Sequence, residues 1–329
     1  NPVWNNHVEL GKWADLFIIA PATSLTISAM VNAECNNLLI ATYLSCKSTV
    51  YVAPAMDFDM YDHPANQSNL EKLKSFGDIV LPVGEGFLAS GLHGKGRMLE
   101  PEEIIKRVKQ DILDKLPLNG KKVLITAGPT YEPIDPVRFI ANHSSGKMGF
   151  ALAEHAVKLG AEVTLISGPT AISTTYNMMI HKVVTSEEMF IQVKKIFNKI
   201  DIAIAAAAVA DFKPKKQYKI KLKKEINFNS IKLVPTQDIL AWMGENKNQQ
   251  FLLGFALETN EEYKNAIKKL KSKNLDAIVM NSFKNSGAGF SGDTNKVSYI
   301  SRKEEIIKFE LKLKNQVAED IFTQILKHE

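Results

Sequence analysis

A serine- and glycine-rich segment, SSGKMG at residues 144–149, carries the residue types best suited to binding an anion. Small side chains let backbone N–H groups approach phosphate oxygens, and a helix that begins here adds partial positive charge at its N-terminus. Arg138 and Lys147 can add full positive charges. The segment therefore predicts a binding site for a phosphate or a nucleotide.

The elements around this segment form a pattern that would position it. Residues 123–126 and 163–167 are short apolar runs typical of buried strands, and residues 150–159 form an amphipathic helical pattern. Strand, loop, helix and strand make a nucleotide-binding βαβ unit. The glycine spacing differs from the dinucleotide-binding signature, and Met148 and Ala141 depart from a P-loop. An NAD(P)-dependent reductase built on a divergent Rossmann unit stays open as an alternative.

Three segments of the first half are also candidates for ligand binding. Apolar runs at residues 14–20 and 49–53 read as parallel strands, and the loops that follow them lie where ligands usually bind in such sheets. An ordinary helix cap by Thr23 or Ser24 would explain the first loop equally well. Residues 84–98 contain five glycines. This indicates a mobile loop or one pressed against a ligand.

Composition limits the class of protein. The chain has 329 residues, 45% hydrophobic and 23% charged, as expected of a globular protein with two domains. We see neither a signal peptide nor an apolar run of membrane-spanning length, so we expect no membrane partner. Cys35 and Cys46 make neither a disulfide framework nor a metal motif, which favours a cytoplasmic protein.

The charge is unevenly distributed. Residues 1–117 carry 10 Lys and Arg against 14 Asp and Glu, a net charge of −4, whereas the remainder carries 31 against 22, a net charge of +9. A basic second half suits small polyanionic molecules. We expect no nucleic-acid partner, because the basic segments lack interleaved aromatic residues. Seven of these lysines lie in residues 213–224, where alternation with Ile220 and Leu222 predicts a flexible strand able to fold over a triphosphate.

Longer motifs resemble known families. The stretch ITAGPTYEPIDPVRFIANHSSGKMG at residues 125–149 closely resembles the signature of phosphopantothenate–cysteine ligases. Upstream, PATSLTISAM, APAMDFDMY and ASGLHGKGRM resemble motifs of phosphopantothenoylcysteine decarboxylases. The order, decarboxylase then ligase, is similar to that of the fused bacterial enzymes of coenzyme A synthesis. This resemblance implies that the two halves act in consecutive steps.

The resemblance also implies the fold. We expect an α/β chain of two doubly wound parallel-sheet domains, a flavodoxin-like flavoprotein domain at residues 1–117 and a Rossmann-like ligase domain at residues 118–329. The chain begins with Asn1, partway into the family pattern, so we expect the first domain to be partial and to lack an early strand and a flavin-phosphate turn. The resemblance further implies homo-oligomers, with dimeric ligase domains and trimeric decarboxylase domains.

For the ligase half, the resemblance implies that 4′-phosphopantothenate attacks CTP to give an acyl-cytidylate and pyrophosphate, and that cysteine then displaces CMP. Lys221 aligns with the catalytic lysine, with Lys219 as its alternative, and would neutralise charge on the α-phosphate. Asn142 would orient the acyl intermediate. Mg2+ would bridge the phosphates through ligands that the sequence does not identify. The implied substrate-binding residues are Gly128, Pro129, Thr130, Arg138, Ser144, Ser145, Gly146, Lys147, Ala208, Asp211, Phe255 and Asn281.

For the decarboxylase half, the resemblance implies that FMN oxidises the cysteinyl thiol side, that carbon dioxide leaves, and that the hydride then returns. His7 would act in acid–base work or in substrate positioning. The glycine-rich segment around Ser90 would be a flap that covers the substrate. The implied cofactor-binding residues are Pro21, Ala22, Thr23, Thr26, Met56 and Met60.

Two residues depart from the decarboxylase pattern. Asp57 stands where relatives usually have Asn, and Ser90 stands where they usually have Cys. The Asn is expected to hold the substrate carboxylate, and the Cys is expected to help reduce the ene-thiol intermediate. We favour a working variant in which Asp57 is protonated when substrate binds. A slower or altered decarboxylase, and a ligase attached to a non-functional flavin domain, stay open.

A non-enzymatic function is the other alternative. Some decarboxylase relatives are flavin-binding regulators that inhibit phosphatases. Long acidic tails would indicate such a regulatory module, and this sequence has none.

Overall fold

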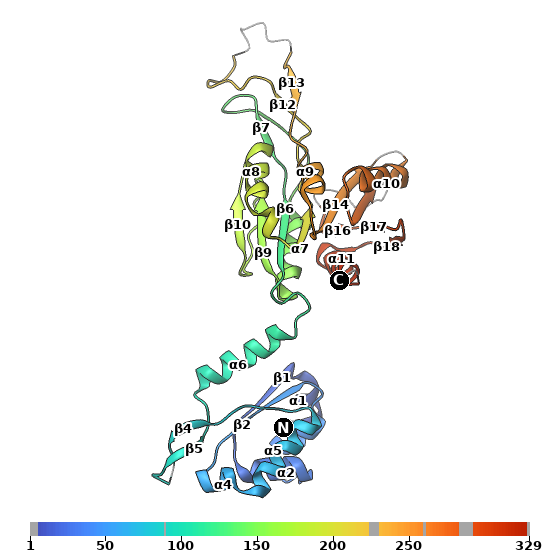
Figure 1. Ribbon diagram of the computed structural model, residues 1–329. Helices are drawn as coiled ribbons and strands as arrows, with labels where there is room; N and C mark the ends of the chain where they lie inside the picture. Colours follow the sequence, from blue (N-terminus) through green and yellow to red (C-terminus); the bar gives the residue numbers. More distant parts are fainter. Residues whose placement is uncertain (1–5, 89, 224–229, 259–260, 283–291, 328–329) are drawn as a thin grey trace, which may run out of the picture. The chain divides into compact units, whose positions relative to one another are not determined.

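The computed structural model describes residues 6–88, 90–223, 230–258, 261–282 and 292–327. The chain divides into two compact units, Asn1–Asp114 and Lys115–Glu329 (Figure 1). The connection between helix α6 (Pro101–Asp114) and strand β6 (Lys122–Ala127) includes the boundary that we predict after residue 117. Among the described residues, every helix is too short or too polar to cross a membrane.

The first unit is built on a parallel sheet in the order β1-β2-β3. Its strands are β1 (Leu16–Ala22), β2 (Thr49–Pro54) and β3 (Ile79–Val80). Its helices are α1 (His7–Trp13), α2 (Ser24–Asn32), α3 (Leu38–Ser45), α4 (Phe58–Asp62), α5 (Pro64–Phe76) and α6 (Pro101–Asp114). One face of the sheet packs against α2, α3 and α5, and the other packs against α6. The strands are therefore apolar on both sides, as in other α/β domains.

The glycine-rich segment of this unit forms a hairpin. Strand β4 (Gly84–Phe87) pairs antiparallel with β5 (His93–Arg97). We predict a loop that is either mobile or pressed against a ligand, and most of this segment is instead a β-hairpin. Ladder hydrogen bonds between the two strands fix its backbone, so the segment has a defined shape.

The second unit contains an eight-stranded sheet in the order β10-β9-β6-β11-β14-β15-β17-β18 (Figure 1). Its strands are β6 (Lys122–Ala127), β9 (Glu162–Ser167), β10 (Met179–Lys182), β11 (Ile202–Ala205), β14 (Phe251–Glu258), β15 (Ala277–Ser282), β17 (Val297–Ser301) and β18 (Ile306–Lys308). The first six strands in this order are parallel to one another. Strand β17 pairs antiparallel with β15, and β18 pairs antiparallel with β17. Strand order reverses between β6 and β11, which is where ligands bind in doubly wound sheets.

Helices cover both faces of this sheet. They are α7 (Lys147–Lys158), α8 (Ser186–Ile196), α9 (Ile239–Asn246), α10 (Glu262–Ser272) and α11 (Lys314–Ile325), with a 3-10 turn at Phe197–Lys199. In β6, Val123 and Ile125 pack beneath α7 and α11, whereas Leu124 packs beneath the helices of the opposite face. This alternation confirms the predicted α/β class with parallel-sheet domains.

Short antiparallel pairs extend from the second unit. They are β7 (Tyr131–Pro133) with β8 (Phe139–Ala141), β12 (Phe212–Pro214) with β13 (Leu233–Pro235), and β16 (Thr294–Asn295) with β19 (Lys312–Leu313). The lysine-rich segment enters β12 only at its start, and residues 215–223 form turns and irregular structure. The predicted strand across residues 213–224 was therefore wrong within the described residues.

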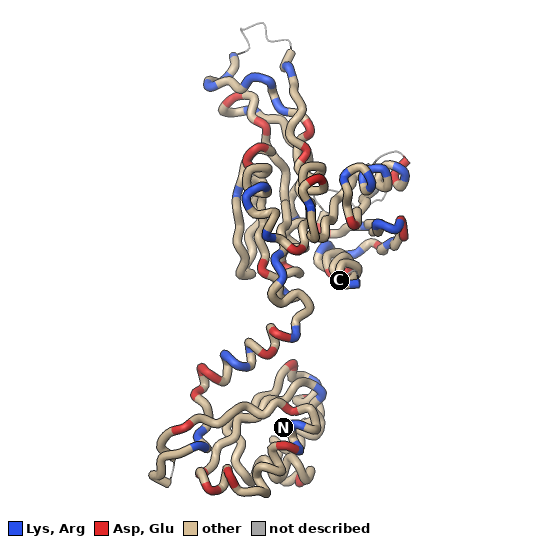
Figure 2. Tube along the Cα trace, viewed as in Figure 1, with Lys and Arg blue, Asp and Glu red and all other residues tan. Residues whose placement is uncertain are grey.

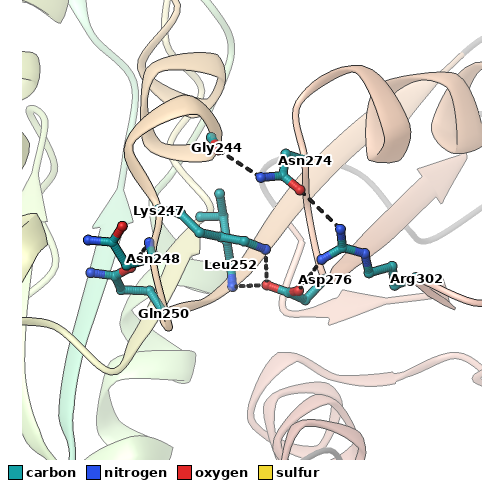
Figure 3. A network of polar contacts seen from close by, with 8 residues as sticks. All are labelled: Gly244, Lys247, Asn248, Gln250, Leu252, Asn274, Asp276 and Arg302. Atoms are coloured by element: carbon teal, nitrogen blue, oxygen red, sulfur yellow. Dashed lines mark hydrogen bonds and ion pairs between the residues drawn. The ribbon is translucent and has the colours of Figure 1, made fainter.

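A polar network ties the amino ends of β14 and β15 together (Figure 3). One oxygen of Asp276 accepts hydrogen bonds from Lys247 Nζ at 2.6 Å and from Leu252 N at 2.8 Å, and its other oxygen pairs with Arg302 at 3.2 Å. Asn274 links Arg302 to the end of α9. This network lies at the opposite end of the strands from the switch point, so it stabilises the sheet rather than the site.

Candidate active sites

A cavity of about 810 Å³ opens at the carboxyl ends of β6, β11, β14 and β15. It lies beside the reversal of strand order, where the fold predicts a ligand. The predicted site residues that line it are Asn142, Ser144, Ser145, Gly146, Lys147, Ala208, Asp211, Phe255 and Asn281. The structure thus gathers most of the predicted ligase residues around one space.

The start of α7 forms one wall of this cavity. Gly146 caps the helix with φ of +80°, a conformation that favours glycine, and Lys147 is the first helical residue. The first backbone N–H groups of a helix have no intrahelical partner, so they can bind phosphate oxygens. Asn142 Nδ2 donates to Val209 O at 2.9 Å, which holds its side chain against the loop that follows β11.

Gly128, Pro129 and Thr130 are placed behind the cavity rather than along its lining. Ala208 N donates to Gly128 O at 2.9 Å, and Ala210 N donates to the hydroxyl of Thr130 at 3.0 Å. Pro129 forms a parallel bridge with Ala208. These three residues fix the loop after β11, so in this structure they act on the cavity through that loop.

Arg138 holds the lysine-rich segment. Its guanidinium pairs with Asp135, whose side chain is fully buried, and it also donates to Leu222 O at 2.9 Å. Asp135 in turn accepts from Leu222 N at 3.2 Å, and the Arg138 hydrogen bond holds the pKa of Asp135 far below its usual range. Lys221 therefore directly precedes a residue, Leu222, whose backbone N and O are both held. The side chains of Lys219 and Lys221 are exposed and lie outside the cavity lining.

Sequence reasoning missed three lysines that line the cavity, namely Lys269, Lys273 and Lys314. Figure 2 shows the concentration of basic residues along α10, where Lys269 lies. Lys273 pairs with Asp238 at 2.7 Å. Burial raises the pKa of Asp238, but hydrogen bonds from Lys273 and from Ala241 N outweigh burial and leave the pKa below its usual range. The spacing of four residues between Lys269 and Lys273 was the available signal, since it places both on one helix face.

The first unit has its own open cavity, of about 440 Å³, beyond the ends of β1 and β2. Of the predicted cofactor residues, Thr23, Met56 and Met60 line it, and the Thr26 hydroxyl lies 3.1 Å from that of Thr23. Pro21 and Ala22 form the end of β1 behind this lining. His7 is the first residue of α1, is half-buried, and does not line the cavity.

The hairpin β4–β5 closes one side of this cavity. Met56 N donates to Gly96 O at 3.0 Å. Gly96 has φ of +129°, and a Cβ added there would lie 2.3 Å from Met56 O. The close approach of these two segments requires glycine, since no other side chain fits both the conformation and the space.

The same hairpin joins the two residues that depart from the decarboxylase pattern. Ser90 Oγ donates to Asp57 Oδ1 at 2.6 Å. Asp57 lines the cavity, and Phe87, Leu88 and Arg97 of the hairpin line it as well. The cavity therefore presents a serine-bound carboxylate within a largely apolar surface.

Comparison with known families agrees with this division. Residues 4–113 match the family described as Flavoprotein, and residues 118–328 match the DNA/pantothenate metabolism flavoprotein C-terminal domain. The second match covers more than half of the chain.

Individual relatives extend across both units. The chain is 43% identical over 328 residues to the coenzyme A biosynthesis bifunctional protein CoaBC of Bacillus subtilis, covering 99% of this chain and 81% of that protein. It is 51% identical over 330 residues to a cysteine/cysteine sulfinic acid decarboxylase of an unknown prokaryotic organism, covering 98% of this chain and 92% of that protein. Both relatives therefore align with this chain across its two units.

Solved structures resemble the second unit. A crystal structure of the C-terminal domain of a CoaBC protein has a TM-score of 0.56 and 41% identity, and covers 65% of this chain and 98% of that one. The DNA/pantothenate metabolism flavoprotein from Streptococcus pneumoniae has the same TM-score at 24% identity, and covers 64% of this chain and 100% of that one. The second similarity supports the fold alone.

Proposed function

Because the chain belongs to the CoaBC family of bifunctional coenzyme A biosynthesis proteins, we propose that its second unit ligates 4′-phosphopantothenate to cysteine and that its first unit is an FMN-dependent decarboxylase. The observation that carries the ligase proposal is the cavity at the switch point, which combines a helix N-terminus, Lys147 and Asn142. Cys35 and Cys46 are both free thiols, in keeping with the cytoplasm as its compartment.

Ligation requires an activated carboxylate. The carboxylate oxygen of 4′-phosphopantothenate forms a bond to the α-phosphorus of CTP, and the bond to the β-phosphate breaks, releasing pyrophosphate. The cysteine amine then attacks the acyl carbon, CMP leaves, and the amine loses a proton. The start of α7 and Lys147 bind phosphate oxygens. The side chain of Lys221 is exposed outside the cavity lining in this structure, so it must turn toward the bound nucleotide to neutralise the charge that develops on the α-phosphate. Asn142 orients the acyl group without reacting.

Four residues of the cavity lining suit a nucleobase. Phe255 of β14 and Asn281 of β15 line the cavity, as do Lys273 and its partner Asp238. A flat ring can lie against Phe255 while the lysine and the carboxylate offer a donor and an acceptor to its edge. This arrangement supports selection of one base, and we propose cytosine.

We propose that Mg2+ enters with the triphosphate. The described residues contain no group of three or more His, Cys, Asp or Glu that would hold a metal by themselves. Mg2+ commonly uses one or two carboxylates together with substrate phosphates, and Asp211 in the lining can supply one.

Pyrophosphate release tests the ligase proposal. With the full chain and 4′-phosphopantothenate, we expect release that favours CTP over ATP. Lys221→Gln should abolish this release, and Lys219→Gln is the matched control that should retain it. Release that ignores 4′-phosphopantothenate, or equal loss in both variants, would contradict the assignment.

The residues of the first unit fit a flavin. The lining is apolar at Met56, Met60 and Phe87, as a flat ring requires, and hydroxyls at Thr23 and Thr26 can bond its polar edge. Bound FMN supplies a two-electron acceptor that allows carbon dioxide to leave and then returns the electrons. The chain's own contribution is to hold the ring, to exclude water with the hairpin, and to place the substrate beside Asp57.

A second candidate substrate for this unit is free cysteine rather than its sulfinic acid, which has no thiol for a flavin to oxidise, and the Asp57–Ser90 hydrogen bond favours it. In phosphopantothenoylcysteine the cysteine nitrogen is a neutral amide, so an ionised Asp57 faces only the substrate carboxylate. Two like charges about 4 Å apart repel by about 1–4 kcal/mol, depending on the local dielectric. Free cysteine carries an ammonium beside its carboxylate, and Asp57 can pair with that ammonium. A relative of 51% identity is named for these two substrates.

Carbon dioxide release from the two kinds of substrate decides between them. If Asp57 binds an ammonium, Asp57→Asn should shift the preference of kcat/KM from cysteine toward phosphopantothenoylcysteine by at least about tenfold. Asp59→Asn removes an exposed acid of the same segment and is the matched control. An unchanged preference in Asp57→Asn would contradict the charge argument. The alternative is that Asp57 binds phosphopantothenoylcysteine in its protonated form. Activity on this substrate would then fall as pH rises in the wild-type chain but not in Asp57→Asn.

We also propose a homo-oligomer, with dimeric ligase units and trimeric decarboxylase units. Apolar side chains are exposed on and between the short strand pairs of the second unit, at Val137, Phe139, Phe212 and Leu233. Exposed apolar groups gathered on extended strand pairs suit contact with a second copy. Phe139→Asp should break the dimer contact between ligase units, so the measured mass of the assembly should fall. The assembly of the first unit should be unchanged.

A further inference from the structure

Two lysines and one aspartate meet where α7 and α11 begin. Lys147 Nζ pairs with Asp293 Oδ1 at 2.6 Å. Lys314 is only 8% exposed, its Nζ donates to Gly292 O at 2.6 Å, and its backbone N donates to Asp293 O at 2.9 Å. Both lysines line the cavity of the second unit. A buried lysine in a nucleotide-sized cavity costs desolvation, which calls for a function.

The two helices reinforce this positive charge. Lys147 and Lys314 are each the first residue of their helix. Further along, His155 of α7 and Phe322 of α11 have ring centroids 5.7 Å apart. The helices therefore run in the same direction side by side, and the positive ends of both dipoles converge on Asp293.

The electrostatics of the cluster are unbalanced. Burial lowers the pKa of Lys314, and the nearby charge of Lys147 lowers it further. The hydrogen bond and charge of Lys147 hold the pKa of Asp293 below its usual range. Among the described residues, Asp293 is the carboxylate that the structure places with these two ammonium groups and two helix N-termini. Its side chain is 76% exposed, so it can leave the cluster for solvent without being buried elsewhere.

We propose that Asp293 is a resident counter-ion that a phosphate group replaces, with Lys147 and Lys314 as the two cations of one phosphate subsite. When the terminal phosphates of the nucleotide arrive, Lys147 Nζ changes partner from the Asp293 carboxylate to phosphate oxygens. Lys314 supplies the second positive charge from beneath. The exchange makes and breaks ion pairs only. This inference rests on the proposed nucleotide-dependent ligation and adds a subsite to it.

Phosphate is the better partner for this cluster. It offers more acceptor oxygens than a carboxylate and more charge, and hydrogen bonds between charged groups are the stronger kind. The Lys147–Asp293 pair is accessible to water, so breaking it costs little. Its role is to hold Lys147 near Lys314 while the cavity has no phosphate, because two like charges otherwise repel.

Binding of inorganic pyrophosphate to the full chain tests the proposal. Asp293→Asn should tighten pyrophosphate binding several-fold, because Lys147 loses its competing partner. Lys314→Gln should weaken pyrophosphate binding and raise the KM for CTP by about tenfold, with the KM values for 4′-phosphopantothenate and cysteine unchanged. Lys312→Gln is the matched control, because Lys312 pairs with Asp320 outside the lining.

Several outcomes would overturn the proposal. Unchanged or weaker pyrophosphate binding in Asp293→Asn contradicts the counter-ion role, even if Lys314→Gln fails to fold. An effect of Lys314→Gln no larger than that of Lys312→Gln contradicts the second cation. If the wild-type chain binds CTP and Asp293→Asn binds pyrophosphate as the wild type does, this inference is refuted and the proposed ligation is not. A folded wild-type chain that binds neither CTP nor pyrophosphate refutes the proposed ligation as well.

Discussion

Replacing Gly96 with alanine tests whether the glycine-rich hairpin shapes the cavity of the first unit. An added Cβ would lie 2.3 Å from Met56 O, whereas ordinary contacts of this kind begin at 3.4 Å. The two segments must therefore separate by about 1 Å or the residue must change conformation. Because Met56 lines the cavity, the separation acts on the ligand directly.

The expected magnitude follows from these two costs. An L-residue held at φ of +129° is strained by about 1–3 kcal/mol, which lowers the stability of the first unit by a similar amount. A displacement of about 1 Å near reacting groups lowers the rate by about 100-fold. We therefore expect kcat/KM for decarboxylation to fall about 100-fold in Gly96→Ala, with a measurable loss of bound flavin.

Flavin absorbance and carbon dioxide release measure this effect, and pyrophosphate release by the second unit is the internal control. Gly91→Ala is the matched variant, because Gly91 also has positive φ, at +83°, but an added Cβ there meets nothing within 4 Å. Equal losses in the two variants would assign the effect to backbone strain alone. Full flavin binding and activity in Gly96→Ala would refute the close-approach argument.

Two further predictions concern the second unit. Lys247→Met removes a side chain that is only 6% exposed from Asp276, and should lower the free energy of unfolding by about 3 kcal/mol in denaturant titrations. Arg302→Met removes the more exposed partner of the same carboxylate and should cost less than about 1 kcal/mol. Burial lowers the pKa of His155, so the unfolded chain binds this proton first as pH falls below about 6.5. Stability should therefore rise with pH up to about that value, and His155→Leu should flatten the rise.

The strand and helix pattern of the second unit was predictable because burial on both faces leaves a signal in every strand. Residues 123–126 and 163–167 are mostly apolar and rich in β-branched side chains, as expected of strands covered by helices on both sides. Strand β6 is longer than its predicted range by one residue at each end, and β9 is longer by one residue at its start. Local sequence determines such elements, so local patterns suffice to find them.

The sequence did not predict which residues of the ligase signature line the cavity and which ones position the loops around it. Thr130 and Arg138 belong to the same signature stretch as Ser145 and Lys147. They nevertheless contact backbone at Ala210 and Leu222 instead of lining the cavity. Those partners lie 80 and 84 residues away in sequence. A contact of that range leaves no periodic signal, so only the folded chain separates residues that bind from residues that position.

The Asp57–Ser90 pair is a second case in which a contact distant in sequence changes the interpretation of single residues. Taken separately, Asp57 and Ser90 each replace the residue that relatives usually have, but the hydrogen bond of 2.6 Å between them couples the two changes. A thiol is a weak donor, so a cysteine at position 90 would leave the Asp57 carboxylate without its strong partner. Restoring one family residue at a time should therefore be more harmful than restoring both. In a double-mutant cycle of Asp57→Asn and Ser90→Cys, we expect the two effects on decarboxylation to be non-additive, and additive effects would show that the two positions vary independently.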